Sequence, residues 1–251
     1  MNHIGIDIGS TASKVSVIVG EELISNFTIP TGWSSIETAN QIKEKLADMG
    51  IDVDKSKVIA TGYGRVSVPY ADKGVTEITC HGQGVHYLLG QDCTVIDIGG
   101  QDTKIISLEN GKVSNFTMND KCAAGTGKFM ELMANTLGVS IYDLAKMALV
   151  GEDIKITSMC TVFAESEVIS LIGQGKDRQD IARGIINSIT GRVSSMLYKH
   201  GSSPTIYLTG GLCEVEPFID LLSEKLNTKV HTTSLARYAG SIGASILAQR
   251  L

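Results

Sequence analysis

The chain has 251 residues, of which 43% are apolar and 20% are charged, and its formal net charge is −5. This composition is typical of a globular protein with a sizeable core and argues against intrinsic disorder, while the acidic balance argues against a nucleic-acid-binding protein. The sequence shows no signal-peptide pattern and no uncharged stretch approaching the about 18 residues that cross a bilayer, so we expect a cytoplasmic protein without membrane contact, whose five cysteines are not paired in disulfides.

The first elements are predicted to be a β-hairpin, a helix and a third strand. Apolar residues alternate over 4–8 and again over 15–19, on either side of a Gly/Ser/Thr turn, which predicts two paired strands. A capping box at 34–37 precedes apolar residues spaced three or four apart, which predicts a helix closed by Gly50. The segment Lys57–Thr61 is predicted to be a strand that leads into a glycine-containing loop.

The opening pattern returns near the middle of the chain, over Thr94–Leu108. The same apolar alternation surrounds five identities, in which Ile6, Asp7, Ile8, Gly9 and Lys14 match Ile96, Asp97, Ile98, Gly99 and Lys104. Two hairpins can look alike by chance, but Asp-x-Gly is an unusual hairpin tip. We therefore interpret the repeat as an internal duplication.

The second half of the chain is predicted to be mainly helical. Apolar residues at helical spacing predict helices over 129–137, from 140 to near 151, and over 161–172, 181–197 and 218–226, with a final apolar-faced segment over 238–251. A strand over 205–208 ends at Gly210-Gly211. The expected fold class is α/β, with two similar domains that each start with a strand hairpin and face each other across a cleft.

Two glycine-rich turns occupy equivalent positions in the duplicated hairpins. In the first, Gly9-Ser10-Thr11 is short enough for backbone N–H groups to approach phosphate oxygens, and Lys14 is a candidate cation. In the second, Gly99-Gly100-Gln101 has the same properties. Both turns are therefore predicted to bind phosphate.

Carboxylates precede both turns. Asp7 and Asp97 lie at strand ends, where a carboxylate can hold Mg²⁺, usually through waters, beside the phosphates. Gln101 or Asp102 is a candidate for orienting an attacking water, as Gln does in other nucleotide hydrolases. A third loop, Thr209-Gly210-Gly211, follows a strand and is expected to accept the adenosine end of a nucleotide.

The three loops, in this order, resemble the acetate kinase, sugar kinase, Hsp70 and actin superfamily over nearly the whole chain. The resemblance implies a duplicated two-domain ATPase core whose cleft closes on ATP. The implied domains are residues 1–92 plus 236–251, and residues 93–235. Neither the P-loop motif nor the Rossmann Gly-x-Gly-x-x-Gly motif occurs, so those two classes have no support.

Two cysteines lie near predicted helix starts. Cys122 precedes the helix at 129–137, and Cys160 precedes the helix at 161–172. The positive end of a helix stabilises a thiolate or a cluster of net negative charge. Spacing alone leaves open whether the two are metal ligands or buried thiols, because no Cys-x-x-Cys occurs.

Longer motifs resemble the activator components of 2-hydroxyacyl-CoA dehydratases. These form the BadF/BadG/BcrA/BcrD ATPase family, which also includes the ATPase components of benzoyl-CoA reductases. The matching segments are Asp7–Lys14, Thr61–Arg65, Glu77–His81, Asp97–Asp102, Asn119–Gly127 and Cys160–Glu167. Ser13 and Gly125-Thr126-Gly127 lie within these motifs and are predicted to join the nucleotide site.

The resemblance implies a homodimer with one [4Fe-4S] cluster between the subunits. Carried over to this chain, the ligands are Cys122 and Cys160. Two thiolates from each chain of a dimer supply the four that a cubane usually takes. Cys80, Cys93 and Cys213 are assigned structural roles.

Two segments depart from the family pattern. Gly82-Gln83-Gly84 replaces the usual Ala-Arg/Lys-Gly, and Leu212–Val215 replaces the usual Val-Ala-x-Asn. The resemblance therefore does not determine the details of the adenosine contacts or the identity of the partner.

The implied activity is ATP-driven electron transfer. An electron from ferredoxin or flavodoxin would pass through the cluster to an iron–sulfur partner, either a 2-hydroxyacyl-CoA dehydratase or a double-cubane cluster protein. One alternative is a small-molecule kinase of the same superfamily, and another is an actin-like or chaperone-like ATPase. Neither alternative needs Cys122 or Cys160, so iron content separates the three.

Overall fold

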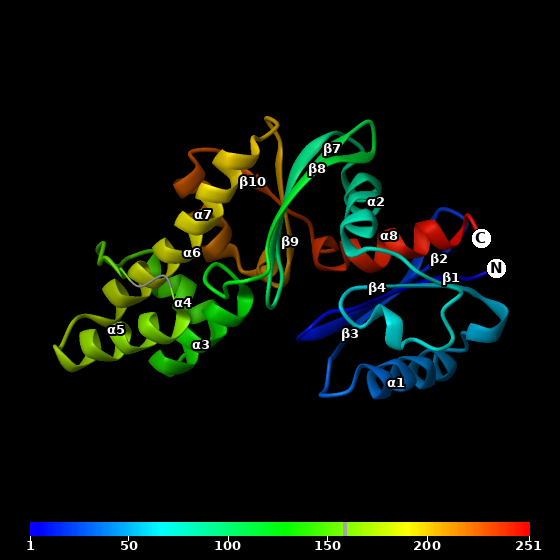
Figure 1. The fold of residues 1–251 in the computed structure, drawn as a ribbon, viewed down its shortest axis with the longest axis horizontal. Coiled ribbons are helices and arrows are strands. Elements are labelled where there is room, and N and C mark those ends of the chain that lie inside the picture. The colour runs from blue at the N-terminus through cyan, green and yellow to red at the C-terminus, as the bar shows by residue number, and fades with distance from the viewer. Residues whose placement is uncertain (158–159) are drawn as a thin grey trace. The chain divides into compact units, whose positions relative to one another are not determined.

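The computed structural model describes residues 1–157 and 160–251, which separate into two compact units (Figure 1). The first unit consists of Met1–Asp92, Leu108–Asn115 and Thr233–Leu251. The second consists of Cys93–Ser107 and Phe116–Thr232. Among the described residues, no helix has both the length and the apolar character needed to cross a bilayer.

The first sheet has five strands in the order β3-β2-β1-β4-β5. They are β1 (His3–Ile8), β2 (Ala12–Val19), β3 (Glu22–Pro30), β4 (Lys57–Thr61) and β5 (Lys73–Gly74). The first three strands pair antiparallel, and β4 and β5 continue the sheet in parallel from β1. The helices that accompany it are α1 (Ser35–Asp48), α2 (Glu77–Leu89) and α8 (Ala239–Ala248).

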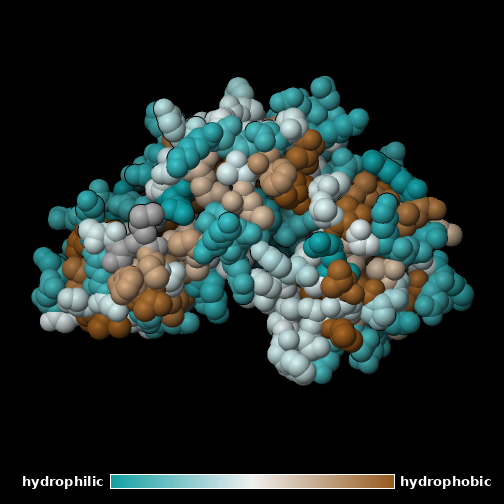
Figure 2. Space-filling model, in the orientation of Figure 1, coloured by the Kyte–Doolittle hydropathy of each residue, from teal (hydrophilic) through white to brown (hydrophobic). Residues whose placement is uncertain are grey.

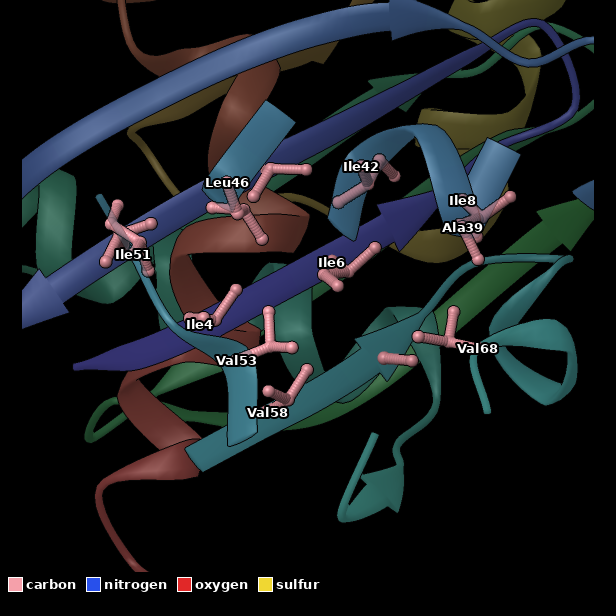
Figure 3. Close-up of a cluster of buried hydrophobic side chains, with 13 residues drawn as sticks. Ile4, Ile6, Ile8, Ala39, Ile42, Leu46, Ile51, Val53, Val58 and Val68 are labelled. Carbon is pink, nitrogen blue, oxygen red and sulfur yellow. The ribbon is translucent and has the colours of Figure 1, made fainter. Parts of the chain in front are cut away.

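One face of this sheet packs against α1 (Figure 3). Ile4, Ile6 and Ile8 of β1 point to the same face because side chains alternate along a strand. They are fully buried together with Ala39, Ile42 and Leu46 of α1. As predicted, α1 begins at a Ser34 cap, whose side chain accepts a hydrogen bond from the Glu37 amide at 3.3 Å.

The helix α8 packs closely on β1, β2 and α2 of the same unit. A Cβ added at Gly5 of β1 would collide with the carbonyl of Ser241 in α8. Added at Gly84 of α2, it would collide with the carbonyl of Ala239. These glycines let α8 approach both elements at backbone distance.

The second sheet has the order β10-β9-β6-β7-β8. Its strands are β6 (Cys93–Ile98), β7 (Thr103–Glu109), β8 (Lys112–Asn119), β9 (Ile206–Gly210) and β10 (Val230–His231). Its helices are α3 (Gly127–Leu137), α4 (Ile141–Ala148), α5 (Thr161–Gly173), α6 (Arg178–His200) and α7 (Glu216–Leu226). Short 3₁₀ turns cover Val53–Lys55, Arg65–Ser67, Gly211–Glu214 and Ala236–Tyr238.

The two sheets share one strand order when the second is read in reverse, so that β6, β7, β8, β9 and β10 correspond to β1, β2, β3, β4 and β5. The parallel pairings β1–β4 and β6–β9 correspond as well. The predicted internal duplication is thus present in the topology. The predicted hairpins and helices are confirmed, whereas β3, β8 and α2 were not predicted from the sequence.

Candidate functional site

Asp7 lies near the end of β1, opposite Lys14 of β2 in the sheet register. The Lys14 Nζ atom is 3.7 Å from Asp7 Oδ2, and the side chain of Lys14 is 17% exposed. Asp7 is buried, and its Oδ1 atom has no hydrogen-bond partner among the described residues. A buried carboxylate oxygen without a partner carries an unmet demand for a donor or a cation.

Glycines surround the Asp7 carboxylate. A Cβ at Gly62 would lie 2.5 Å from Asp7 Oδ1, and a Cβ at Gly240 would lie 3.0 Å from Oδ2. A side chain at either glycine would therefore crowd the carboxylate. An unpaired carboxylate oxygen fits a hydrated Mg²⁺ ion, which usually keeps several waters and takes one or two carboxylates.

The other residues of the first loop range from exposed to fully buried. Gly9 and Ser10 are half-buried and Thr11 is exposed, as a phosphate-binding turn requires. A Cβ at Gly9 would lie 2.8 Å from the carbonyl of Ala12, so the turn has no room for a side chain there. Ser13 is fully buried, and its hydroxyl lies 2.6 Å from that of Thr31.

The second loop contains a buried charge cluster. The Lys104 Nζ atom lies 3.3 Å from Asp97 Oδ2 and 2.8 Å from Asp102 Oδ2, and all three side chains are at most 4% exposed. Thr209 donates a hydrogen bond of 2.8 Å to Asp97 Oδ1. Gln101, in contrast, is exposed. Of the two predicted candidates for orienting water, Gln101 is the accessible one.

The third loop has a counterpart in the first unit that the sequence reading missed. Thr209 pairs with Asp97 in the sheet, as Thr61 pairs with Asp7. The glycine that follows each threonine has a positive φ, 84° at Gly210 and 82° at Gly62. A Cβ at either glycine would collide with the carbonyl of Ile98 or Ile8, respectively. The recurring Thr-Gly pair at the ends of β4 and β9 is the sequence signal that could have revealed this correspondence.

The five cysteines divide by exposure, and none forms a disulfide. Cys160 is exposed and Cys122 is half-buried, whereas Cys80, Cys93 and Cys213 are buried. Burial raises the pKa of the Cys80 thiol to about 12. The two accessible thiols are the two predicted ligands.

Cys160 occupies the N-cap position of α5, where its side chain makes no capping hydrogen bond. The first-turn amides of that helix therefore favour negative charge at this cysteine. Cys122 precedes α3 by a short segment and its carbonyl accepts a 2.8 Å hydrogen bond from the Asn119 side chain.

The segment between Cys122 and α3 is attached to the second loop. The Gly127 amide donates to the carbonyl of Gly99, and the Lys128 amide donates to that of Gly100, both at 2.9 Å. Within the segment, the Thr126 hydroxyl donates to the carbonyl of Ala123 at 2.6 Å. The structure thus joins the predicted residues Gly125-Thr126-Gly127 to the predicted phosphate loop.

The donor set fits a cluster shared between two chains. Iron–sulfur cubanes take thiolate ligands, usually four, and one chain offers two accessible thiols. Large apolar side chains of α5 close to Cys160 are also exposed, with Val162 at 66% and Phe163 at 67%. Figure 2 shows hydrophobic residues at the surface in the region of α3 and α5. Exposed apolar groups beside Cys160 are suited to a protein interface.

The chain is similar to known proteins over its whole length. It is 41% identical to the (R)-2-hydroxyglutaryl-CoA dehydratase activating ATPase of Acidaminococcus fermentans, an alignment that covers 98% of this chain and 96% of the relative. The crystal structure of component A of that dehydratase superposes with a TM-score of 0.93 at 40% identity, covering 100% of this chain and 98% of the other. The activator of the 2-hydroxyisocaproyl-CoA dehydratase from Clostridium difficile, solved with ADPNP, superposes with a TM-score of 0.91 at 36% identity, covering 99% and 94%.

More distant structures share the fold alone. A ROK-family glucokinase from Streptomyces griseus superposes with a TM-score of 0.62 at 15% identity and covers the full length of both chains. This likeness confirms the predicted α/β fold class, the duplicated core found in sugar kinases. The model of the BadF/BadG/BcrA/BcrD ATPase family matches residues 4–248. With the same motifs, the same fold and full-length relatives, the chain belongs to the BadF/BadG/BcrA/BcrD ATPase family.

Proposed function

We propose that this ATPase is an iron–sulfur reductase that acts as a homodimer and drives a low-potential electron into a partner enzyme. The observation that carries the proposal is the backbone connection between the second phosphate loop and the segment that bears Cys122. An ATPase site and a thiol site that share one hydrogen-bonded segment have a physical route for coupling. A small-molecule kinase would leave the two accessible thiols without a task.

The ATP-handling groups come from both glycine-rich loops. Asp7 holds Mg²⁺ through water, and its unpartnered Oδ1 atom supports this role. The partly exposed Lys14 binds a phosphate oxygen. Gln101 orients the attacking water, since its side chain is exposed.

Asp97, the carboxylate of the second loop, has a structural role in this proposal. Asp97 is engaged by Lys104 and Thr209, so it acts by fixing the end of β6 and the loop that follows. Within Gly99-Gly100-Gln101, the Gly99 amide donates to the carbonyl of Asp102, and the amides of Gly100 and Gln101 remain for a phosphate. Ser13 and Thr126 support their loops. Gly210 fits against the carbonyl of Ile98 and shapes the third loop, and the open space at Gly211 leaves room for the adenosine.

The redox site is formed by Cys122 and Cys160 of two chains. A [4Fe-4S] cluster held there supplies one-electron redox chemistry. The chain contributes two thiolates, the N-terminus of α5 that favours negative charge, and exposed apolar side chains for the dimer contact. A homodimer meets the need for four thiolates by symmetry.

Coupling follows from differential binding. ATP shifts a conformational equilibrium only if it binds two states with different affinity. A phosphate on the amides of Gly100 and Gln101 acts on the loop whose Gly99 and Gly100 carbonyls hold Gly127 and Lys128, and through them on the Cys122 segment. Solvent exposure and hydrogen bonding at the thiolates in turn set the reduction potential.

The electron acceptor is an iron–sulfur enzyme. Relatives that carry the names of activators of 2-hydroxyglutaryl-, 2-hydroxyisocaproyl- and lactoyl-CoA dehydratases support a dehydratase partner, and a double-cubane cluster protein is the other partner we consider. Ferredoxin or flavodoxin supplies the electron. The cytoplasm is the location that we propose for this reaction.

Iron analysis of protein purified without oxygen tests the proposal. We expect about two irons per chain, and loss of iron in both Cys122→Ala and Cys160→Ala. Cys93→Ala is the matched control, since Cys93 is buried in β6, and it should retain the iron. Full iron occupancy in Cys122→Ala would exclude that residue as a ligand and remove the redox site from the account.

A further inference from the structure

Arg192 of α6 is a half-buried arginine whose guanidinium has no hydrogen bond or ion pair to any residue that the structure describes. Arg183 of the same helix, in contrast, forms ion pairs with two carboxylates. Its guanidinium lies 3.2 Å from Asp153 and 2.6 Å from Glu224, and the Glu224 hydrogen bond raises the pKa of Arg183. Arg192 thus carries a cation that its own surroundings do not neutralise.

The side chain of Arg192 packs against Gly125. A Cβ at Gly125 would lie 3.0 Å from Arg192 Cγ and 3.3 Å from Arg192 Cβ, and Gly125 has a φ of 92°. The carbonyl of Gly125 accepts a 2.7 Å hydrogen bond from the Thr103 hydroxyl. The chain at Gly125 is therefore held between α6 on one side and the start of β7 on the other.

Gly125 belongs to the segment that is attached to the second phosphate loop through Gly127 and Gly99. An anion on that loop needs a positive charge nearby. Lys104 does not provide it, because it is buried between two carboxylates. Lys128 is paired with Glu131 at 3.0 Å. Arg192 and the exposed Lys121 have no such pairing among the described residues, and Arg192 is the one of the two that packs against Gly125.

We propose that Arg192 is a further nucleotide-binding residue, which donates hydrogen bonds to a phosphate oxygen of the nucleotide held by Gly99-Gly100-Gln101. The assignment rests on the proposed function and adds the cation of the second loop, the counterpart of Lys14 in the first. A guanidinium suits this task because its planar fork matches two phosphate oxygens. Arg192 contacts Gly125, which lies three residues after Cys122. A phosphate bound by Arg192 would therefore also act on the Cys122 segment.

The experiment compares Arg192→Gln, Arg192→Lys and the control Arg183→Gln in the cluster-containing protein. The dissociation constant for ATP is measured without oxygen by equilibrium dialysis, alongside iron content and the unfolding midpoint. Losing a charge-assisted hydrogen bond should raise the ATP dissociation constant of Arg192→Gln by about 10- to 100-fold. Iron content should be unchanged, and Arg192→Lys should recover part of the affinity. Arg183→Gln should keep wild-type affinity, because Arg183 binds carboxylates of its own unit.

An unchanged ATP dissociation constant in Arg192→Gln would overturn the assignment. If that variant instead lost iron or changed the EPR spectrum at unchanged affinity, the anion that Arg192 serves would be the cluster, and the assignment would be wrong. A wild-type protein that binds no ATP would overturn the proposed function and this assignment together.

Discussion

Asp7 and Asp97 occupy equivalent positions in two sheets of the same strand order, but their carboxylates are engaged differently. Both oxygens of Asp97 have partners, Thr209 on Oδ1 and Lys104 on Oδ2. Asp7 has Lys14 at 3.7 Å on Oδ2, and its Oδ1 has no hydrogen-bond partner in the described part of the chain. The duplication thus contains one carboxylate with both oxygens engaged and one with an oxygen that has no partner among the described residues.

The buried cluster around Lys104 should be essential for stability. Lys104→Met leaves Asp97 and Asp102 buried without their cation, and breaking a buried ion pair in this way costs about 3–5 kcal/mol. The control is Lys128→Met, which removes the surface pair with Glu131 and should cost at most about 1 kcal/mol. Urea unfolding measures both. Equal midpoints for the two variants would contradict the structural role of Lys104.

Asp7→Asn should lower ATP hydrolysis by about 10²–10³-fold at saturating Mg-ATP, because it removes the carboxylate that places the metal. Iron content should not change, since Asp7 lies in the first unit and both predicted ligand cysteines lie in the second. Asp48→Asn, an exposed position in α1, is the control and should keep wild-type turnover. Wild-type turnover in Asp7→Asn would remove Asp7 from the site.

Gly243→Ala should destabilise the first unit. A Cβ at this position of α8 would collide with the carbonyl of Cys80 in α2, and overpacking against backbone typically costs about 1–3 kcal/mol. Gly191→Ala in α6 is a matched helix substitution, since its Cβ would meet only Lys225 Cε at 4.0 Å. That variant should be neutral or stabilised by up to about 1 kcal/mol. Thermal unfolding decides, and a Gly243→Ala midpoint at or above that of Gly191→Ala would contradict the close packing.

Thiol reactivity should separate the cysteines once iron has been removed by chelation. The pKa of Cys80 is raised to about 12 by burial, so at pH 8 this thiol remains protonated and should react slowly with iodoacetamide. Cys160 is exposed and should react first. Mass spectrometry of the labelled peptides measures the order. Labelling of Cys80 as fast as Cys160 would show that the first unit opens readily.

The elements that the sequence predicted were those with a clear periodic pattern. Ile4, Ile6 and Ile8 alternate because one face of β1 is covered by α1, and this burial is visible as a period of two. Every residue of β3 and β8 is half-buried or exposed, so no alternation of buried and exposed positions marked these strands. The helix α2 escaped prediction because Gly82 and Gly84 lower helix propensity.

The candidate site was predicted from local motifs, but the ion pairs and hydrogen bonds among its residues were not predicted. Lys14 and Lys104 match in the duplicated sequence, but Lys104 is buried between two carboxylates, whereas Lys14 is partly exposed beside one. The difference between the two lysines arises from burial in the tertiary structure, which a local sequence motif does not reveal. Arg192 lies outside all the motifs, and its place beside Gly125 results from the packing of α6.

The most direct test of the account is the EPR spectrum of the reduced, iron-loaded protein measured without nucleotide, with ADP and with a non-hydrolysable ATP analogue. The hydrogen bonds from Gly127 and Lys128 to the second phosphate loop predict that nucleotide alters the surroundings of Cys122. We expect the spectrum with the ATP analogue to differ from the other two, together with a changed rate of iron chelation. Identical spectra and identical chelation rates in all three conditions would contradict the coupling of ATP to electron transfer.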